Sequence, residues 1–256
     1  MDTSIIEAHP MPAGTLGIAH FLAQGDALSR VLLAILLIMS LVSWYFIAAK
    51  ALGILLERRR GAKFLTLFWN APSVAEVARR LEASAPDEAF SQLTWQAIEA
   101  SRHHKRHGAS RLEDVGHRGE FLTRAMRRAI DQETARLESG LAVLASVGST
   151  APFIGLFGTV WGVYHALVNI GLSGQGSLDQ VAGPVGEALI MTALGLAVAI
   201  PAVLAYNAVV RSNRVVLSQL DGFAHDLHAV LTTGEPVGTR GSGAATRTPL
   251  HDSAGA

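Results

Sequence analysis

The run from Val185 to Val210 is almost wholly apolar and contains a single carboxylate, Glu187. A helix needs about 20 residues to cross the hydrocarbon core of a bilayer, so this run is long enough to span one. A carboxylate at membrane depth is costly unless it is paired, hydrated or protonated, and such residues usually mark an ion or proton pathway. The run therefore predicts a membrane-spanning helix with a functional carboxylate. A structural carboxylate hydrogen-bonded between subunits is the alternative for Glu187.

Two further apolar blocks are also long enough to span a bilayer. We predict transmembrane helices over residues 31–49, 141–170 and 185–210. The chain is 50% hydrophobic, and its 16% of charged residues falls well below the roughly 25% typical of soluble domains. The sequence therefore predicts an all-α membrane protein in a lipid bilayer, with three transmembrane helices and long cytoplasmic helical extensions.

The basic residues predict the orientation, because Lys and Arg near the ends of transmembrane helices favour the cytoplasm. Of the 21 Lys and Arg residues, 16 lie in residues 50–140, and none lies between Gly171 and Pro184. A tail dominated by Gly, Ser, Thr and Pro is expected to be disordered. The predicted segments are a periplasmic N-terminal segment (1–30), a cytoplasmic helical loop (50–140), a periplasmic hairpin (171–184), a cytoplasmic helix (211–231) and a disordered tail (232–256).

The cytoplasmic loop is expected to be helical. Ser73 and Glu76 have the spacing of a capping box, in which each residue satisfies the other's backbone N–H and a helix begins. The Pro86-Asp87 pair predicts the start of another helix, which ends near Gly108. From Arg118 onward no strong helix breaker precedes the second apolar block, so one long helix is expected to run from the loop into the membrane.

Small side chains follow one face of each of the last two apolar blocks. Apolar burial alone gives little association in lipid, and small residues let helix backbones approach closely. Glu187 and Thr192 lie along the stripe of the third block. The residues that we expect to pack in this way are Gly155, Gly158, Gly162, Ala188, Gly195 and Ala199.

Prolines and a threonine interrupt these apolar blocks. Pro152 and Pro201 predict helix kinks. The carbonyl that Pro152 leaves free is expected to bond with the hydroxyls of Ser149 and Thr150, or with water. Thr159 lies deep in the second block, where its hydroxyl either bonds back to its own helix or lines a pore.

Several function classes find no support in the sequence. The chain has no cysteine, no phosphate-binding loop, no nucleophile elbow and no HExxH zinc motif, so we expect no enzyme activity and no cofactor. The net charge is zero, so the sequence gives no indication of a nucleic-acid partner. The basic, His-rich run from Arg102 to His107 is best explained as a solvated helix end. His225 and His228 could hold a metal with Asp221 and Asp226, but an exposed amphipathic helix explains them equally well.

Two motifs, GEALIMTALGLAVAIPAVLAYN (Gly186 to Asn207) and STAPFIGLFGTVWGVYHAL (Ser149 to Leu167), resemble the MotA/TolQ/ExbB proton-channel family, and most closely its ExbB branch. The family's pore glutamate falls on Glu187, and its two pore threonines fall on Thr159 and Thr192. The layout of three spans with a large loop after the first also matches the family. The first span here lacks a carboxylate, so the resemblance implies no charged role for that helix.

The resemblance implies a homopentamer in the bacterial inner membrane, whose second and third spans line a pore that holds the helices of an ExbD-like dimer. It further implies that proton flow is passed to a TonB-like protein, which drives outer-membrane import of iron-siderophore complexes and vitamin B12. Two alternatives remain open. One is a TolQ-like subunit that powers the Tol-Pal envelope system, and the other is a non-conducting membrane scaffold.

Overall fold

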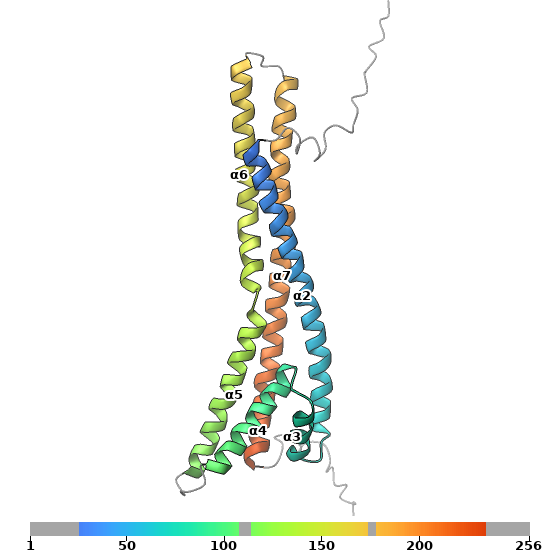
Figure 1. Ribbon diagram of the computed structural model, residues 1–256, viewed down its shortest axis with the longest axis vertical. Helices are drawn as coiled ribbons and strands as arrows, with labels where there is room; N and C mark the ends of the chain where they lie inside the picture. The colour runs from blue at the N-terminus through green and yellow to red at the C-terminus, as the bar shows by residue number, and fades with distance from the viewer. Residues whose placement is uncertain (1–25, 108–113, 174–177, 234–256) are drawn as a thin grey trace, which may run out of the picture. The chain divides into compact units, whose positions relative to one another are not determined.

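The computed structural model describes residues 26–107, 114–173 and 178–233, and this part of the chain is helical and contains no β-strand (Figure 1). Three helical stretches, Ala27–Trp69, Gly119–Leu172 and Ala188–Thr233, are long and apolar enough to cross a membrane. The predicted all-α class with three membrane-spanning helices is therefore confirmed. The helices are α2 (Ala27–Trp69), α3 (Val74–Ala83), α4 (Ala89–His107), α5 (Asp114–Glu138), α6 (Leu141–Ser173) and α7 (Leu178–Thr233).

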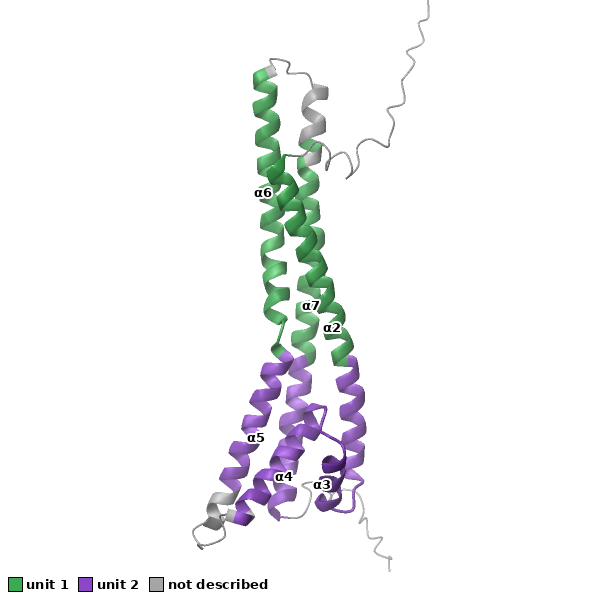
Figure 2. Ribbon diagram, in the orientation of Figure 1, with its two compact units in different colours: residues 1–54, 138–212 green, residues 55–137, 213–256 purple. Residues whose placement is uncertain are grey.

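The chain divides into two compact units, which Figure 2 colours separately. Unit 1 comprises Met1–Ile54 and Glu138–Ser212, and unit 2 comprises Leu55–Leu137 and Asn213–Ala256. The boundary between the units falls within α2, which has 43 residues, and within α7, which has 56 residues. Both helices therefore contribute to both units. At 1.5 Å per residue, α7 is about 84 Å long, far longer than the membrane core alone requires.

Unit 1 holds the apolar blocks. A small core joins α2, α6 and α7 through Leu32, Leu36, Ala151, Met191 and Ala199. Large apolar side chains of α2 point away from that core: Leu37, Leu41 and Tyr45 are 62%, 65% and 69% exposed. Exposed apolar side chains of this size suit contact with lipid, as expected for the first span.

Unit 2 is built like a water-soluble helical bundle. Rings of Phe68 and Phe90 pack edge-on against Phe223 of α7, with centroids 5.1 and 5.6 Å apart. The amphipathic face of α5 completes this core through Leu122 and Met126, whose side chains are buried. The unit therefore has the apolar interior that drives folding in water.

Helix starts in unit 2 depend on polar side chains. Ser73 caps α3 by accepting the backbone N–H of Glu76 at 3.3 Å, which confirms that half of the predicted capping box. The Glu76 carboxylate binds Arg79 and Arg80 in place of the Ser73 backbone. α4 begins with a carboxylate cap, because Glu88 accepts the backbone N–H of Phe90 at 2.9 Å. Such contacts satisfy donors that the first turn of a helix leaves unpaired.

The expectation of one continuous helix from Arg118 into the membrane is wrong. α5 ends at Glu138 and α6 begins at Leu141, with Gly140 between them in the left-handed region at φ 75°. Glycine adopts this conformation without the clash that a Cβ causes, so it ends a helix readily. A Cβ at Gly140 would also lie 2.5 Å from Cε1 of Phe46. The glycine therefore permits both the break and the close packing of α2 in unit 1.

The boundaries of the other predicted segments also differ. α2 begins at Ala27 and α6 continues to Ser173, so both extend beyond their predicted spans. α7 begins at Leu178 and passes through Gly183 and Pro184, within the segment where a hairpin was expected. Residues 1–25 and 234–256, which include most of the predicted N-terminal segment and tail, lie outside the described residues.

Pro152 lies within α6, and α7 passes through Pro201. The hydroxyls of Ser149 and Thr150 donate to the carbonyl of Ser146, at 3.1 and 2.7 Å. We had expected them to bond with the carbonyl four residues before Pro152, which the proline leaves free. Their hydrogen bonds go to Ser146 instead. Hydroxyls in a helix reach the carbonyl three or four residues earlier, which explains this choice.

Two buried carboxylates in unit 2 were not anticipated from the sequence. Glu88 and Glu133 are 2% and 3% exposed. Arg136 lies 3.5 Å from Glu133 and donates to Glu57 at 2.9 Å, and Glu57 in turn accepts the backbone N–H of Ala89 at 2.8 Å. Burial raises the pKa of Glu133; Arg136 lowers it, and the charge of Glu57 raises it further. Burial likewise raises the pKa of Glu88, although hydrogen bonds from Phe90 and Ser91 oppose the shift.

Gly140→Ala is expected to destabilise unit 1. A left-handed alanine costs roughly 1–2 kcal/mol, and its Cβ would overlap the Phe46 ring. Thermal unfolding of the detergent-solubilised protein measures the effect. Gly53→Ala is the matched control, because a Cβ at Gly53 has no heavy atom within 4 Å and alanine favours the helix. An unchanged unfolding temperature for Gly140→Ala would contradict the assignment.

Unit 2 is expected to become more stable as the pH falls through the raised pKa of Glu133 toward the ordinary value of 4.5. In that window the folded protein binds a proton that the unfolded chain does not, so the unfolding free energy rises. The gain is lost as the pH rises again. Glu133→Gln is expected to flatten this dependence in denaturant unfolding followed at several pH values, whereas Glu120→Gln, at an exposed carboxylate, should retain it. An unaltered profile in Glu133→Gln would exclude the carboxyl as its source.

Candidate functional site

The predicted pore helices approach each other closely in unit 1. A Cβ added to Gly155 would lie 2.6 Å from the backbone oxygen of Met191, and one added to Gly195 would lie 2.7 Å from that of Ala151. A Cβ at Gly162 would lie 2.9 Å from Cβ of Ala188. α6 and α7 are therefore antiparallel neighbours whose backbones touch at small residues, as close packing in lipid requires.

The other predicted packing residues lie along the same contact. A Cβ at Gly158 would lie 2.9 Å from Cε of Met191, so a flexible side chain fills the space there. Ala188 and Ala199 are each 3% exposed. The three glycines of α6, Gly195 and Ala188 thus lie in the interface of α6 and α7, and Ala199 lies in the core that joins both helices to α2.

The close approach brings the two predicted pore threonines together. Oγ1 of Thr159 lies 2.5 Å from Oγ1 of Thr192, across the interface. Thr159 also lies within hydrogen-bond distance of two backbone oxygens, that of Ala188 at 2.9 Å and that of Gly155 at 3.2 Å. Its hydroxyl therefore contacts its own helix, as the first alternative for Thr159 expected, and also the neighbouring helix.

The donors and acceptors of the two threonines can form one chain of hydrogen bonds. A hydroxyl has one hydrogen to donate and two lone pairs to accept with. When Thr159 donates to the Ala188 oxygen, its own oxygen can accept the hydrogen of Thr192. Both side chains are only partly buried in the single chain. The pair can therefore link α6 and α7 through a hydrogen-bond chain that ends at a backbone oxygen.

Glu187 lies in α7, directly before Ala188. The structure describes the backbone of Glu187 but not its side chain. Its backbone position is nevertheless defined, because Ala188 faces Gly162 across the helix interface. We call the ends of α6 and α7 that flank residues 174–177 the hairpin end. Five residues separate Glu187 from Thr192, so Glu187 lies about 7.5 Å nearer the hairpin end at 1.5 Å per residue.

One polar contact was missed by the sequence analysis. Oδ2 of Asp26, just before α2, lies 3.3 Å from Nε2 of His165 in α6. Asp26 had been assigned to the N-terminal segment. The expected layout of the spans contained a usable signal, since it places the start of the first helix beside the end of the second.

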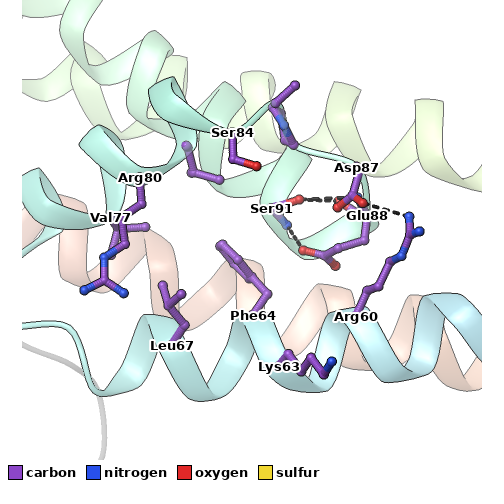
Figure 3. A pocket seen from close by; sticks show the side chains of 13 residues that line it. Arg60, Lys63, Phe64, Leu67, Val77, Arg80, Ser84, Asp87, Glu88 and Ser91 are labelled. Atoms are coloured by element: carbon purple, nitrogen blue, oxygen red, sulfur yellow. Dashed lines mark hydrogen bonds and ion pairs between the residues drawn. The ribbon is translucent and has the colours of Figure 1, made fainter.

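Unit 2 contains a cavity of about 310 Å³ where α2, α3 and the start of α4 meet (Figure 3). Phe64 and Val77 supply apolar walls, and Arg60 binds Asp87 at 2.7 Å on its rim. The cavity contains none of the predicted pore residues, so we assign it no role in the pathway. Among the described residues, no group of three or more His, Cys, Asp or Glu is placed to hold a metal, which removes support for a site at His225 and His228.

Comparison with known proteins identifies the family. The model described as "MotA/TolQ/ExbB proton channel family" matches residues 84–222, more than half of the 256 residues. The chain belongs to the MotA/TolQ/ExbB proton channel family. The resemblance carried by the two pore motifs is thereby confirmed.

Relatives in this family align with three-quarters or more of the chain. "Biopolymer transport protein ExbB" of Xanthomonas campestris pv. campestris is 43% identical over 230 residues, which is 87% of this chain and 91% of that protein. The protein of the same name from Neisseria meningitidis is 41% identical over 208 residues, 81% of this chain and 94% of that one. "Tol-Pal system protein TolQ" of Pseudomonas aeruginosa is 34% identical over 194 residues, 75% and 82% respectively. The chain is a multi-pass inner-membrane protein and a proton-channel subunit of the ExbB or TolQ type.

Thr192→Val is expected to lower proton flux while the protein still assembles. Valine has the same shape but lacks the hydroxyl, and Thr159 retains its two backbone acceptors. Thr192→Ser keeps the hydroxyl and should conduct like the wild type. Both variants are measured by proton flux into liposomes that contain the assembled channel, at equal protein content. Wild-type flux in Thr192→Val would separate the threonine pair from proton movement.

Proposed function

We propose that this chain is an ExbB-type subunit of an inner-membrane proton channel that works with an ExbD-like protein. The complex couples the proton motive force to a TonB-like protein, which energises outer-membrane import of iron-siderophore complexes and vitamin B12. The carrying observation is the 41–43% identity to proteins named ExbB over more than four-fifths of the chain. The TolQ of Pseudomonas aeruginosa is less similar, at 34% over three-quarters of the chain.

In the proposed mechanism, Glu187 exchanges protons with a carboxylate of the partner or orders a file of water beside it. Thr159 and Thr192 continue the pathway away from the hairpin end through their hydroxyl contact. α6 and α7 of several copies, five in the proposed homopentamer, surround the ExbD-like helices. A carboxylate at membrane depth needs a partner, water or a proton, and a shared pore supplies these.

The proposed orientation places the N-terminus in the periplasm and the C-terminus and unit 2 in the cytoplasm. The distribution of basic residues supports it, since 16 of 21 Lys and Arg lie in residues 50–140. Under this orientation the hairpin end of unit 1 faces the periplasm. Protons driven inward would then reach Glu187 before the threonine pair.

A TolQ-like role is the second candidate, because the pore region is shared with that branch. "Tol-Pal system protein TolQ" of Haemophilus influenzae is 51% identical over 84 residues, although these form only 33% of this chain. In this case the same proton pathway would power the Tol-Pal envelope system. A passive scaffold is the third possibility, and it requires no titrating group at Glu187.

Glu187→Gln is expected to abolish growth on an iron-siderophore as sole iron source, in cells that lack their own copy of the gene. Glutamine has nearly the same shape but cannot carry a proton. Growth is measured at matched membrane levels, and co-purification with the ExbD-like partner reports assembly. Glu138→Gln is the control, because that exposed carboxylate lies outside the predicted spans.

Three outcomes separate the candidates. Lost growth with assembly intact supports the ExbB-type mechanism. Normal growth, with detergent sensitivity and chained cells in Glu187→Gln, would favour the TolQ-like role. Normal growth together with an intact envelope would favour the scaffold.

A further inference from the structure

Three polar side chains meet near the hairpin end of unit 1. Asp26 contacts Nε2 of His165 through Oδ2 at 3.3 Å. The indole of Trp161, one helical turn earlier in α6, lies against the imidazole with ring centroids 4.5 Å apart. The start of α2 and the last turns of α6 are thus joined by the contact of a carboxylate with an imidazole, and the indole packs against that imidazole.

Two buried atoms of this cluster have no hydrogen-bond partner among the described residues: Nε1 of Trp161 and Nδ1 of His165. Buried polar atoms are nearly always paired, so an exception calls for a physical explanation. The indole nitrogen can only donate, whereas an imidazole nitrogen can accept. A water that accepts from Trp161 and donates to His165 would satisfy both atoms.

The contact with Asp26 determines what the free imidazole nitrogen can do. A neutral imidazole that donates through Nε2 to a carboxylate presents Nδ1 as an acceptor. When Nδ1 takes a proton, the ring becomes a cation, and the carboxylate of Asp26 balances its charge. Imidazole is the side chain best suited to gain and lose a proton near neutral pH.

The register of α6 and α7 places this cluster next to the pathway. Gly162 faces Ala188 across the interface, and Glu187 directly precedes Ala188. His165 follows Gly162 by three residues, about 4.5 Å along the helix axis toward the hairpin end. His165 therefore lies slightly nearer the hairpin end than the backbone of Glu187.

Other charged and titratable groups near the cluster are few among the described residues. On α2, the backbone N–H of Arg30 donates to the backbone oxygen of Asp26 at 3.0 Å. On α6, the Tyr164 ring lies edge-on to His165, with centroids 5.5 Å apart. α7 contributes Glu187 at the neighbouring level. Glu187 is the carboxyl that the proposed function places in the pathway, and its backbone lies close to the level of His165.

We propose that Asp26, Trp161 and His165 form a proton-uptake site at the hairpin end of unit 1, which loads protons that then move to Glu187. The proposal rests on the proton-channel function proposed above. His165 carries the proton on Nδ1; the new N–H bond breaks when the proton passes to the next acceptor. Asp26 is a positioning residue that orients the ring and balances its charge. Trp161 holds the water that delivers the proton.

The test uses the full chain purified with its ExbD-like partner and placed in liposomes that enclose a pH-sensitive dye. Proton flux is driven by a membrane potential and measured at external pH values from about 5.5 to 8. His165→Gln can still donate to Asp26 but cannot carry a proton. We expect it to lower flux about tenfold at the high-pH end, at or below the usual contribution of a proton-transfer group. The loss should shrink at the low-pH end, where protons in bulk water are abundant.

Further variants separate the roles. Asp26→Asn and Trp161→Phe should each lower flux by a smaller factor than His165→Gln and with the same pH trend. Tyr164→Phe is the control for Trp161→Phe, because it removes a polar atom from a neighbouring ring that is 59% exposed. His103→Gln, in unit 2, is the control for the histidine change. Both controls should conduct like the wild type.

Two outcomes would overturn the proposal. Wild-type flux in His165→Gln at every pH would show that protons bypass the site. An equal loss at every pH would assign the Asp26–His165 contact to holding α2 against α6. Glu187→Gln, measured in parallel, tests the proposed function itself. If Glu187→Gln conducts no protons, the proposed function is supported even when the His165 result contradicts the uptake site. If Glu187→Gln conducts like the wild type, the proposed function is contradicted, and the uptake site that rests on it is contradicted too.

Discussion

The candidate site depends on the close approach of α6 and α7 at Gly155 and Gly195. Lipid is as apolar as the helices, so burial of apolar surface does little to hold them together. Small side chains let the backbones touch, with a Cβ at either glycine falling under 3 Å from the facing helix. Only at this separation can the hydroxyls of Thr159 and Thr192 lie 2.5 Å apart. The same packing therefore stabilises unit 1 and assembles its polar pair.

Unit 2 is stabilised in a different way. Its aromatic core, centred on Phe223, gains from removal of apolar surface from water. Its buried charges are tied to structure, because Glu57 and Glu88 both accept backbone N–H groups at the start of α4. Negative charge is favourable at a helix N-terminus, where backbone donors are unpaired. These carboxylates fix the start of α4, and burial raises the pKa of Glu88.

The polar groups of unit 1 follow an order along the helices. Of the groups discussed above, Asp26 and His165 lie nearer the hairpin end than Glu187, and the threonine pair lies beyond Glu187. Membrane proteins retain costly polar groups where these serve transport, which gives the sequence of groups a physical rationale. In the proposed complex, ExbD-like helices would supply the remaining partners.

The sequence by itself determined the class of the protein and the identity of the pore candidates. Apolar length predicts three spans, small-residue spacing predicts close packing, and one carboxylate stands out among apolar neighbours. Only the tertiary structure decided which atoms meet. The break at Gly140 depends on a positive φ beside Phe46, and the contact of Asp26 with His165 joins residues far apart in the chain. Periodicity reports which face of a helix is apolar, but the partner of each side chain is set by helix register and separation, which local sequence does not encode.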